Sequence, residues 1–220
     1  MKKIIIAVFL ITMITAGVFC QTGTIRELSG EVELKHAGSS SFVKASAGDT
    51  VARDTIVSTG FRSTAVIAIG SSVITVRPLT RLSLAEIQSA DNTESVNVNL
   101  QAGRVRVEVK PPAGTKANFS VQSPSATASV RGTTFESDTD NVKVRDGKVT
   151  FKGKNGPPVI VTTGGASGIG KGGIPKDPVT LAEESTQPPA PVGTPGGEMV
   201  SQPTSMINGE MSFILNYGPW

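Results

Sequence analysis

A glycine-rich run is the segment whose residues look most like cofactor chemistry. Residues 163–170 read TGGASGIG and follow the apolar residues 159–161, the order in which a pyrophosphate-binding loop follows a strand. Such a loop must open a helix, but the next residues, KGGIPKDP, contain two glycines and two prolines. The sequence around the run therefore argues against dinucleotide binding.

The same run also approaches the spacing of a phosphate-binding loop. Gly165, Gly170 and Lys171 occupy the expected positions, but Gly172 stands where a serine or threonine would hold Mg²⁺. We therefore predict no cofactor and no cofactor-binding residues.

An acidic run, Glu136-Ser-Asp138-Thr-Asp140, could touch a hard cation. A calcium loop also needs a glycine and a later bidentate carboxylate, which are missing here, so an acidic turn or edge strand is the alternative. His36 is the only histidine and falls in an expected turn, so neither a zinc site nor a nucleophile–base pair has partners. We predict no metal-binding and no catalytic residues, and we expect the protein not to be an enzyme.

The elements that would position these residues are short strands. The chain has 220 residues with 24 glycines, 14 prolines and 5% aromatic residues, a composition typical of strands and turns. The formal charge of +3 falls close to neutral without Lys2 and Lys3, and no basic stripe is interleaved with aromatics. Nucleic acid is therefore not an expected partner.

Residues 1–20 have the pattern of a secretory signal peptide. Two lysines precede an apolar run from Ile4, and small residues lie around Gly17. An uncleaved membrane anchor is the alternative, although the run is short for a membrane span. We expect an extracytoplasmic location: periplasmic, outer-membrane-associated or secreted.

Cys20, the only cysteine, has two interpretations. Cleavage could fall just after it, or it could be the lipidated first residue of a lipoprotein. Gly17 and Phe19 fit poorly where a lipobox has leucine and a small residue. A lipid on Cys20 is the one membrane contact we expect.

Residues 21–162 alternate as half-buried strands do. Val105, Val107 and Val109 alternate with charged residues, which predicts an inward and a solvated face. Residues 65–69 are apolar on both faces, which predicts a strand covered on both sides. Residues 89–94, SADNTE, are expected to form a loop between two lobes.

A short pattern recurs as GEVEL, GRVRV and GKVTF, beginning at Gly30, Gly103 and Gly147. We interpret these glycines as hairpin exits with positive φ before a strand. Gly132 is expected at a kink where a side chain would crowd the backbone. Beside it, Arg131 either contacts a ligand or makes a structural hydrogen bond.

The C-terminal part changes composition. Residues 163–205 are rich in glycine and proline, which predicts a low-complexity, flexible tail without stable packing. Residues 206–220 contain the only tryptophan and tyrosine of the chain. This apolar segment either docks as a strand on an exposed sheet edge of its own domain or binds a partner as a linear peptide.

Residues 24–162 resemble the FecR domain. In the first lobe the similar positions are Gly48-Asp49, Thr59, residues 65–69, Pro78 and the spaced leucines Leu82 and Leu84, and the small turn GSS departs slightly from the family's usual Asp-Gly-Ser. In the second lobe they are Pro124, the Val-Arg-Gly-Thr of residues 130–133, Phe135, Gly147 and Val149.

This resemblance implies an all-β fold of short antiparallel strands in a two-lobed FecR-type sandwich or roll. The family is best known for membrane regulators that sense iron–siderophore uptake, which carry a cytoplasmic anti-sigma segment. Only three residues precede the apolar run here, so we do not expect that arm. The resemblance implies a non-enzymatic binding or scaffolding module in the bacterial cell envelope, with an envelope protein or glycan as partner. The alternative is a sensory component of iron-type envelope signalling that works with a separate membrane partner.

Overall fold

The computed structural model describes residues 22–90 and 92–180 and folds them into two sheets of nine strands each. In pairing order, sheet 1 consists of β18 (Val179–Thr180), β17 (Gly165–Gly168), β14 (Asn141–Asp146), β13 (Thr134–Asp138), β10 (Arg104–Val109), β7 (Ser72–Val76), β6 (Thr64–Ile69), β1 (Gly23–Ser29) and β4 (Thr50–Val51). Sheet 2 consists of β16 (Val159–Thr162), β15 (Lys148–Gly153), β12 (Ala126–Val130), β11 (Lys116–Gln122), β9 (Thr93–Ala102), β8 (Arg81–Ala90), β5 (Ile56–Thr59), β2 (Val32–Lys35) and β3 (Val43–Lys44). One 3₁₀ turn, η1 (Lys171–Gly173), is the only helical element of the described residues, so the all-β fold class is confirmed.

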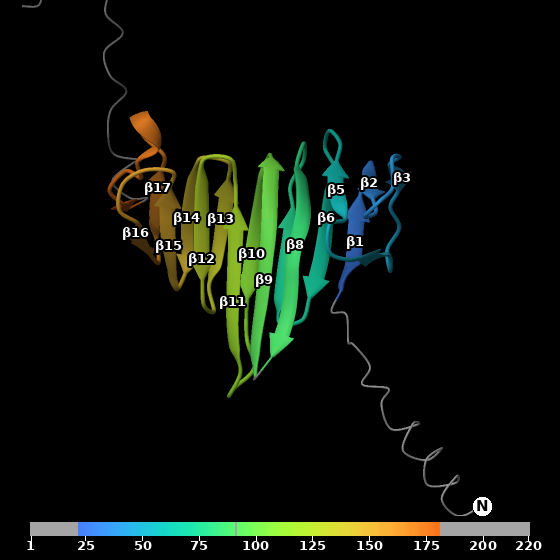
Figure 1. Cartoon of the computed structure of the whole chain (residues 1–220), viewed down its shortest axis with the longest axis horizontal. Helices are drawn as coiled ribbons and strands as arrows, with labels where there is room; N and C mark the ends of the chain where they lie inside the picture. The colour runs from blue at the N-terminus through green and yellow to red at the C-terminus, as the bar shows by residue number, and fades with distance from the viewer. Residues whose placement is uncertain (1–21, 91, 181–220) are drawn as a thin grey trace, which may run out of the picture. The chain divides into compact units, whose positions relative to one another are not determined.

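The chain builds both sheets together by crossing repeatedly from one to the other. After β5 of sheet 2 it forms β6 and β7 in sheet 1, then β8 and β9 in sheet 2, then β10 in sheet 1. Figure 1 shows the result as a colour gradient that runs along the sheets from blue β1 to orange β17. Segments close in sequence therefore stay close in space, and the fold is a roll rather than two separate lobes.

The core lies between the two sheets. Strand β6 buries Ala65, Ile67 and Ile69, and β9 buries Val98 and Leu100, all in one hydrophobic cluster to which both sheets contribute. Strands β6 and β10 alternate buried and more exposed residues, as a strand with one covered face must. The predicted inward face of residues 105–109 is confirmed.

The prediction that residues 65–69 are covered on both faces is wrong. Val66 and Ala68 lie on the outer face of sheet 1 and are only half-buried. Small or β-branched residues suit a pleated surface whether or not a second layer covers it, so the apolar run alone did not decide burial.

The expected loop at residues 89–94 is also wrong. Strand β8 continues to Ala90 and β9 begins at Thr93, and the two form a long antiparallel hairpin with Ala90 opposite Thr93. In Figure 1 this hairpin lies near the middle of the row of strands. Ser89, Thr93 and Glu94, three of the polar residues that suggested a loop, belong to strand ends. The hairpin joins what the sequence presents as two lobes.

One strand pair departs from the expected antiparallel arrangement. Strand β11 runs parallel to β9, with Asn97 opposite Ser120, while the other pairs of named strands are antiparallel. The intervening strand β10 lies in the other sheet, so β9 and β11 are joined by a crossover rather than a hairpin, as parallel pairing requires.

The expectation of a flexible tail from residue 163 is wrong for residues 165–180. Strand β17 pairs with β14 and all four of its residues are buried, and β18 pairs with β17. The Ser167 hydroxyl donates to the Lys176 carbonyl at 2.7 Å. Glycine-rich segments are often disordered, but a glycine without a side chain also lets the backbone approach its neighbours closely. A Cβ on Gly165 would lie 3.0 Å from the Thr162 carbonyl oxygen.

The three recurrent glycines stand at crossovers between sheets. Gly30, Gly103 and Gly147 have φ of +78°, +89° and +94°, so the predicted positive φ is confirmed. Each lies between a strand of one sheet and a strand of the other, however, so they are not exits of hairpins within a sheet. The recurrence marks the places where the roll turns from one layer to the next.

Each of these glycines packs against the buried hydroxyl of a residue in a second crossover. That second crossover leads between the same two sheets in the opposite direction. A Cβ at any of the three positions would come closer than 3.0 Å to that hydroxyl, and the hydroxyl bonds the backbone of the residue after the glycine. The bonds are Glu31 N–H to Ser63 Oγ (2.8 Å), Arg104 N–H to Thr80 Oγ1 (3.0 Å) and Thr133 Oγ1–H to the Lys148 carbonyl (3.0 Å). The paired crossovers thus supply hydrogen-bond partners to backbone groups at the points where the chain changes sheets.

Gly132 is not crowded, contrary to expectation. A Cβ there would meet Pro111 Cδ at 3.7 Å, an ordinary contact, so its φ of +69° is what favours glycine. Arg131 beside it is exposed, and its Nε donates to Asn118 Oδ1 at 3.2 Å.

In the described part of the chain no helix is long and apolar enough to cross a membrane. The predicted signal peptide, Cys20 and the apolar segment 206–220 lie outside the described residues, as do residues 181–205 of the predicted tail.

Candidate functional site

The acidic run falls on β13 and the turn that follows it. Glu136 and Asp138 lie on the outer face of sheet 1, and Asp140 lies in the turn before β14. Strands β14 and β10 pair with β13, and β7 pairs with the far side of β10. Arginines on or next to these three strands lie on the same outer face. The sequence alone indicates a solvated face only for the charged residues 104–110, and it connects none of these arginines with the carboxylates.

Glu136 lies among cations. Arg77 Nη2 donates to its Oε1 at 3.0 Å, and Arg145 Nη2 lies 3.9 Å from its Oε2. Its cross-strand neighbours are Arg106 on one side and Lys143 on the other. The side chain of Glu136 is only 18% exposed, so these ion pairs are partly shielded from water.

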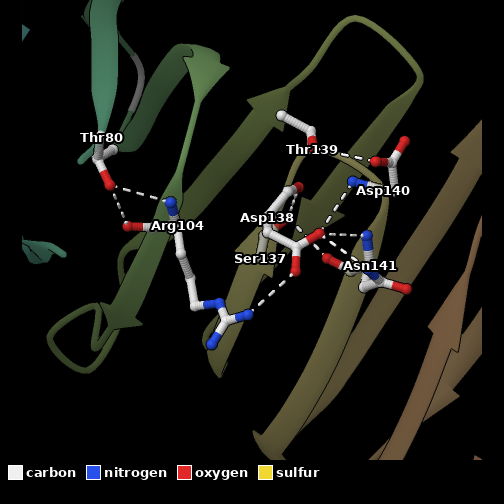
Figure 2. Close-up of polar contacts among 7 residues, drawn as sticks. All are labelled: Thr80, Arg104, Ser137, Asp138, Thr139, Asp140 and Asn141. Carbon is white, nitrogen blue, oxygen red and sulfur yellow. Dashed lines mark hydrogen bonds and ion pairs between the residues drawn. The ribbon is translucent and has the colours of Figure 1, made fainter. Parts of the chain in front are cut away.

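The two carboxylate oxygens of Asp138 have different partners: one accepts hydrogen bonds from the following turn, and the other faces an arginine (Figure 2). Oδ1 accepts from the Asp140 N–H (3.0 Å) and from the backbone and side-chain N–H groups of Asn141 (2.8 and 3.0 Å). Oδ2 lies 3.5 Å from Arg104 Nη2. Asp138 therefore shapes the turn and also orients a guanidinium.

Arg104 is fixed at its backbone by Thr80. The Thr80 hydroxyl accepts from the Arg104 N–H at 3.0 Å and lies 3.1 Å from the Arg104 carbonyl oxygen, to which it donates. Thr80 is buried, so this pair lies beneath the surface while the Arg104 side chain, 60% exposed, reaches outward.

Asp140 is occupied by protein groups. Ser125 Oγ–H donates to its Oδ1 at 2.7 Å and Thr139 Oγ1–H to its Oδ2 at 3.0 Å, while Ser125 also contacts the Thr139 carbonyl. Within residues 22–90 and 92–180, no group of three or more histidine, cysteine or acidic residues could hold a metal ion. The acidic run is thus an ion-paired strand and a hydrogen-bonded turn.

A cavity of about 710 Å³ lies over these residues. We call it the arginine groove; its defining residues are Arg77, Leu79, Arg104, Glu136, Asp138 and Arg145. Three guanidinium groups share two carboxylates here, and their side chains remain 40% to 60% exposed. Guanidinium donors therefore remain for an external anion, because each group carries five N–H donors.

An apolar lip borders the groove. Leu79 lines it and is 62% exposed, and its N–H donates to the Gly60 carbonyl at 3.2 Å. Phe61 follows Gly60 and is 73% exposed, with the Arg62 guanidinium 5.5 Å from its ring centre. Two large apolar side chains thus project from adjoining crossovers beside the arginines.

The other chemical candidates do not join this site. The run at residues 163–170 forms a turn and strand β17, whose backbone pairs with β14 and β18 instead of facing a phosphate. His36 is exposed in the turn after β2. The sequence signal for the groove was the ladder of residues 104–110, but its partners at positions 77 and 145 lie on strands that only the fold brings together.

The molecule is an all-β, two-sheet domain with a basic groove on one outer face. Residues 55–150 match the family model described as "FecR protein".

The chain is also similar to two crystal structures of a "putative anti-sigma factor" from Parabacteroides distasonis. Each shows 16% sequence identity and a TM-score of 0.46, over 57% of this chain and 59% of that protein. This chain thus spans less than two thirds of the length of those proteins. No match was found among the curated proteins.

Proposed function

We propose that this FecR-domain protein is a non-enzymatic binding module that acts as a sensory component of envelope signalling, outside the cytoplasm, with a separate membrane partner. The arginine groove is the surface that binds this partner. The observation that carries the proposal is the shared use of Glu136 and Asp138 by Arg77, Arg104 and Arg145, which leaves the groove with more cationic than anionic groups. The match to the FecR family supports the same function.

The chemistry of the groove favours an acidic protein segment. Partly exposed arginines form charge-assisted hydrogen bonds with carboxylates, and the fork of a guanidinium fits a carboxylate in two-point contact. Leu79 and Phe61 offer an apolar contact beside the charges. Arginine and aromatic residues together are typical of the side chains that dominate protein interfaces.

The residues of the groove support binding rather than catalysis. Its carboxylates are ion-paired with arginines, and the hydroxyl of Thr80 is used by the Arg104 backbone. A nucleophile needs an adjacent base, and the two carboxylates that line the groove are each held in an ion pair with an arginine. The groove can orient and neutralise an anionic partner.

The test compares two charge-matched double variants of the full chain. A fluorescent peptide of alternating glutamate and leucine serves as the probe, and its anisotropy is followed at low and at physiological salt. We expect Arg104→Gln/Arg145→Gln to weaken binding by about ten-fold or more, because each lost contact is charge-assisted. Arg26→Gln/Arg53→Gln, which removes two exposed arginines elsewhere, should leave it unchanged.

The cellular arm uses a photo-reactive residue in place of Phe61. We expect it to cross-link to a membrane signalling protein in the wild-type background and not in Arg104→Gln/Arg145→Gln. Equal probe binding by both double variants, or cross-linking that is indifferent to the groove arginines, would contradict the proposal.

A further inference from the structure

The outer face of sheet 2 carries a second depression, separate from the arginine groove. It has a volume of about 720 Å³ and lies over β8, β9, β11, β12 and β15. The register places one outward residue of each strand in a single row across the sheet. That row runs Glu86, Asn97, Ser120, Ser129 and Thr150. We call this depression the polar groove.

Within the polar groove, the three central strands β9, β11 and β12 present only uncharged polar side chains outward. These residues are Ser95, Asn97, Asn118, Ser120 and Ser129, while the exposed Lys116 at the start of β11 lies outside the groove lining. The outer face of sheet 1 is instead charged along β10 and β13. A solvated sheet face usually mixes in lysine and glutamate, so the difference between the two faces indicates that the polar groove has a different ligand.

The floor of the polar groove has no exposed apolar side chain. Val96, Phe119 and Val130 reach it only through their backbone side and are at most 4% exposed. Hydroxyl and amide groups can both donate and accept hydrogen bonds, which is also what the hydroxyl groups of a sugar do. An apolar peptide anchor, by contrast, would find no pocket here.

Charges stand at opposite ends of the row. Glu86 lies at the β8 end, and Arg131 and Lys148 lie at the β12–β15 end. Arg131 Nε is held by Asn118, which fixes the guanidinium at the rim. Four inter-strand steps separate the two ends, a span of roughly 19 Å. The groove thus fits an extended polar ligand with a negative group at one end.

Asn97 supplies an independent sign of a missing partner. Its side-chain oxygen is buried and has no hydrogen-bond partner among the described residues. Buried polar atoms are nearly always paired, and Asn97 is one of the residues that line the groove. A hydroxyl-bearing ligand over β9 would satisfy it.

We propose that the polar groove binds an acidic glycan, with sugar hydroxyls over the Asn97–Ser120–Ser129 row and a carboxylate or other anionic group at Arg131 and Lys148. The groove has no aromatic platform, so each site binds weakly and a polymer engages many copies at once. This site is separate from the arginine groove and does not depend on the function proposed for it.

The test titrates the full chain, labelled with ¹⁵N, with three probes: an oligosaccharide of uronic acids, a neutral dextran oligosaccharide and a polyglutamate peptide. We expect the uronic-acid probe to shift resonances of β9, β11 and β12, and dextran to bind more weakly. Arg131→Gln/Lys148→Gln should reduce uronic-acid binding by about ten-fold, the effect of lost charge-assisted hydrogen bonds. Ser120→Val/Ser129→Val should reduce binding of both glycans.

A cross-control separates the two sites. Arg104→Gln/Arg145→Gln should lose polyglutamate binding and keep uronic-acid binding. The proposal is overturned if neither glycan shifts β9, β11 and β12 at millimolar concentration. It is also overturned if the glycan shifts persist unchanged in both polar-groove variants, or if they vanish only with the sheet 1 arginines.

Discussion

The Thr80 hydroxyl and the backbone of Arg104 hold each other in a reciprocal hydrogen-bonded pair. Thr80 Oγ1 accepts from the Arg104 N–H at 3.0 Å and donates toward the Arg104 carbonyl, 3.1 Å away (Figure 2). The pair joins the β7–β8 crossover to the β9–β10 crossover. It thereby sets where β10 begins and where the Arg104 side chain meets Asp138.

Removing this hydroxyl should destabilise the fold. In Thr80→Val the Arg104 N–H loses its partner in a buried place, which costs about 1–3 kcal/mol. The measurement is the free energy of unfolding in urea. Thr75→Val, a half-buried position on β7 whose hydroxyl makes no hydrogen bond among the described residues, is the control and should lie near zero. Equal losses in the two variants would show that the pair contributes nothing.

Gly103 should tolerate no side chain, for two separable reasons. Its φ is +89°, and a Cβ would lie 2.5 Å from Thr80 Cα and 2.7 Å from the Leu79 carbonyl oxygen. Gly48 has a φ of +95° with nothing within 4 Å, so it isolates the cost of the dihedral angle. We expect Gly48→Ala to cost about 1–2 kcal/mol and Gly103→Ala about 3 kcal/mol or more. If Gly48→Ala and Gly103→Ala lower the free energy of unfolding in urea by similar amounts, the steric contribution at Gly103 is ruled out.

Gly132 should accept asparagine. Its φ of +69° lies in the left-handed region that asparagine tolerates, and the nearest contact of a Cβ is ordinary. We expect Gly132→Asn to lower the melting temperature by only about 2–4 °C, roughly 1 kcal/mol. Gly147→Asn should cost more, because its Cβ would lie 2.8 Å from Thr133 Oγ1. A larger loss of stability in Gly132→Asn than in Gly147→Asn would indicate that the backbone at Gly132 is crowded after all.

Strand β17 should contribute measurably to stability. A chain that ends at Thr163 lacks the strand that pairs with β14, whereas a chain that ends at Thr180 keeps it. Loss of β17 uncovers part of the apolar surface near Val142 and Val144. We expect the shorter chain to melt about 5–10 °C below the longer one, roughly 2–3 kcal/mol. Equal melting temperatures of the two chains by calorimetry would show that residues 164–180 do not contribute to stability.

Glu108 should titrate below its ordinary value. The hydrogen bond from Lys110 lowers the pKa of the Glu108 carboxyl below 4.5, partial burial opposes this, and the charges of Lys110 and Arg106 lower it further. Because the folded pKa is depressed, the pair stabilises the protein above pH 4.5, and this stabilisation is lost as the pH falls through the folded pKa. A carboxyl ¹³C titration should show a midpoint below 4.5 that moves up in Lys110→Ala. An unchanged midpoint in that variant would exclude Lys110 as the cause.

Much of the local structure could be predicted from residue order. Alternating Val105, Val107 and Val109 fixed the inward face of β10, and the recurrent glycines marked positive φ. Both signals are local, because side-chain direction and backbone dihedral depend on neighbouring residues. The same local reasoning failed at residues 163–180, where glycine content predicted disorder but β14 offered an edge to pair with.

The sequence by itself determined the all-β class, the resemblance to the FecR family and the identity of the charged strand β10. Only the tertiary structure decided that Glu136 would meet Arg77, 59 positions away, and that the run at residues 163–170 would contain a strand paired with β14 and β18. The physical reason is the roll: each crossover moves the chain between sheets, so partners across a sheet are set by strand order. Strand order depends on how the two layers pack, a property that no single segment encodes.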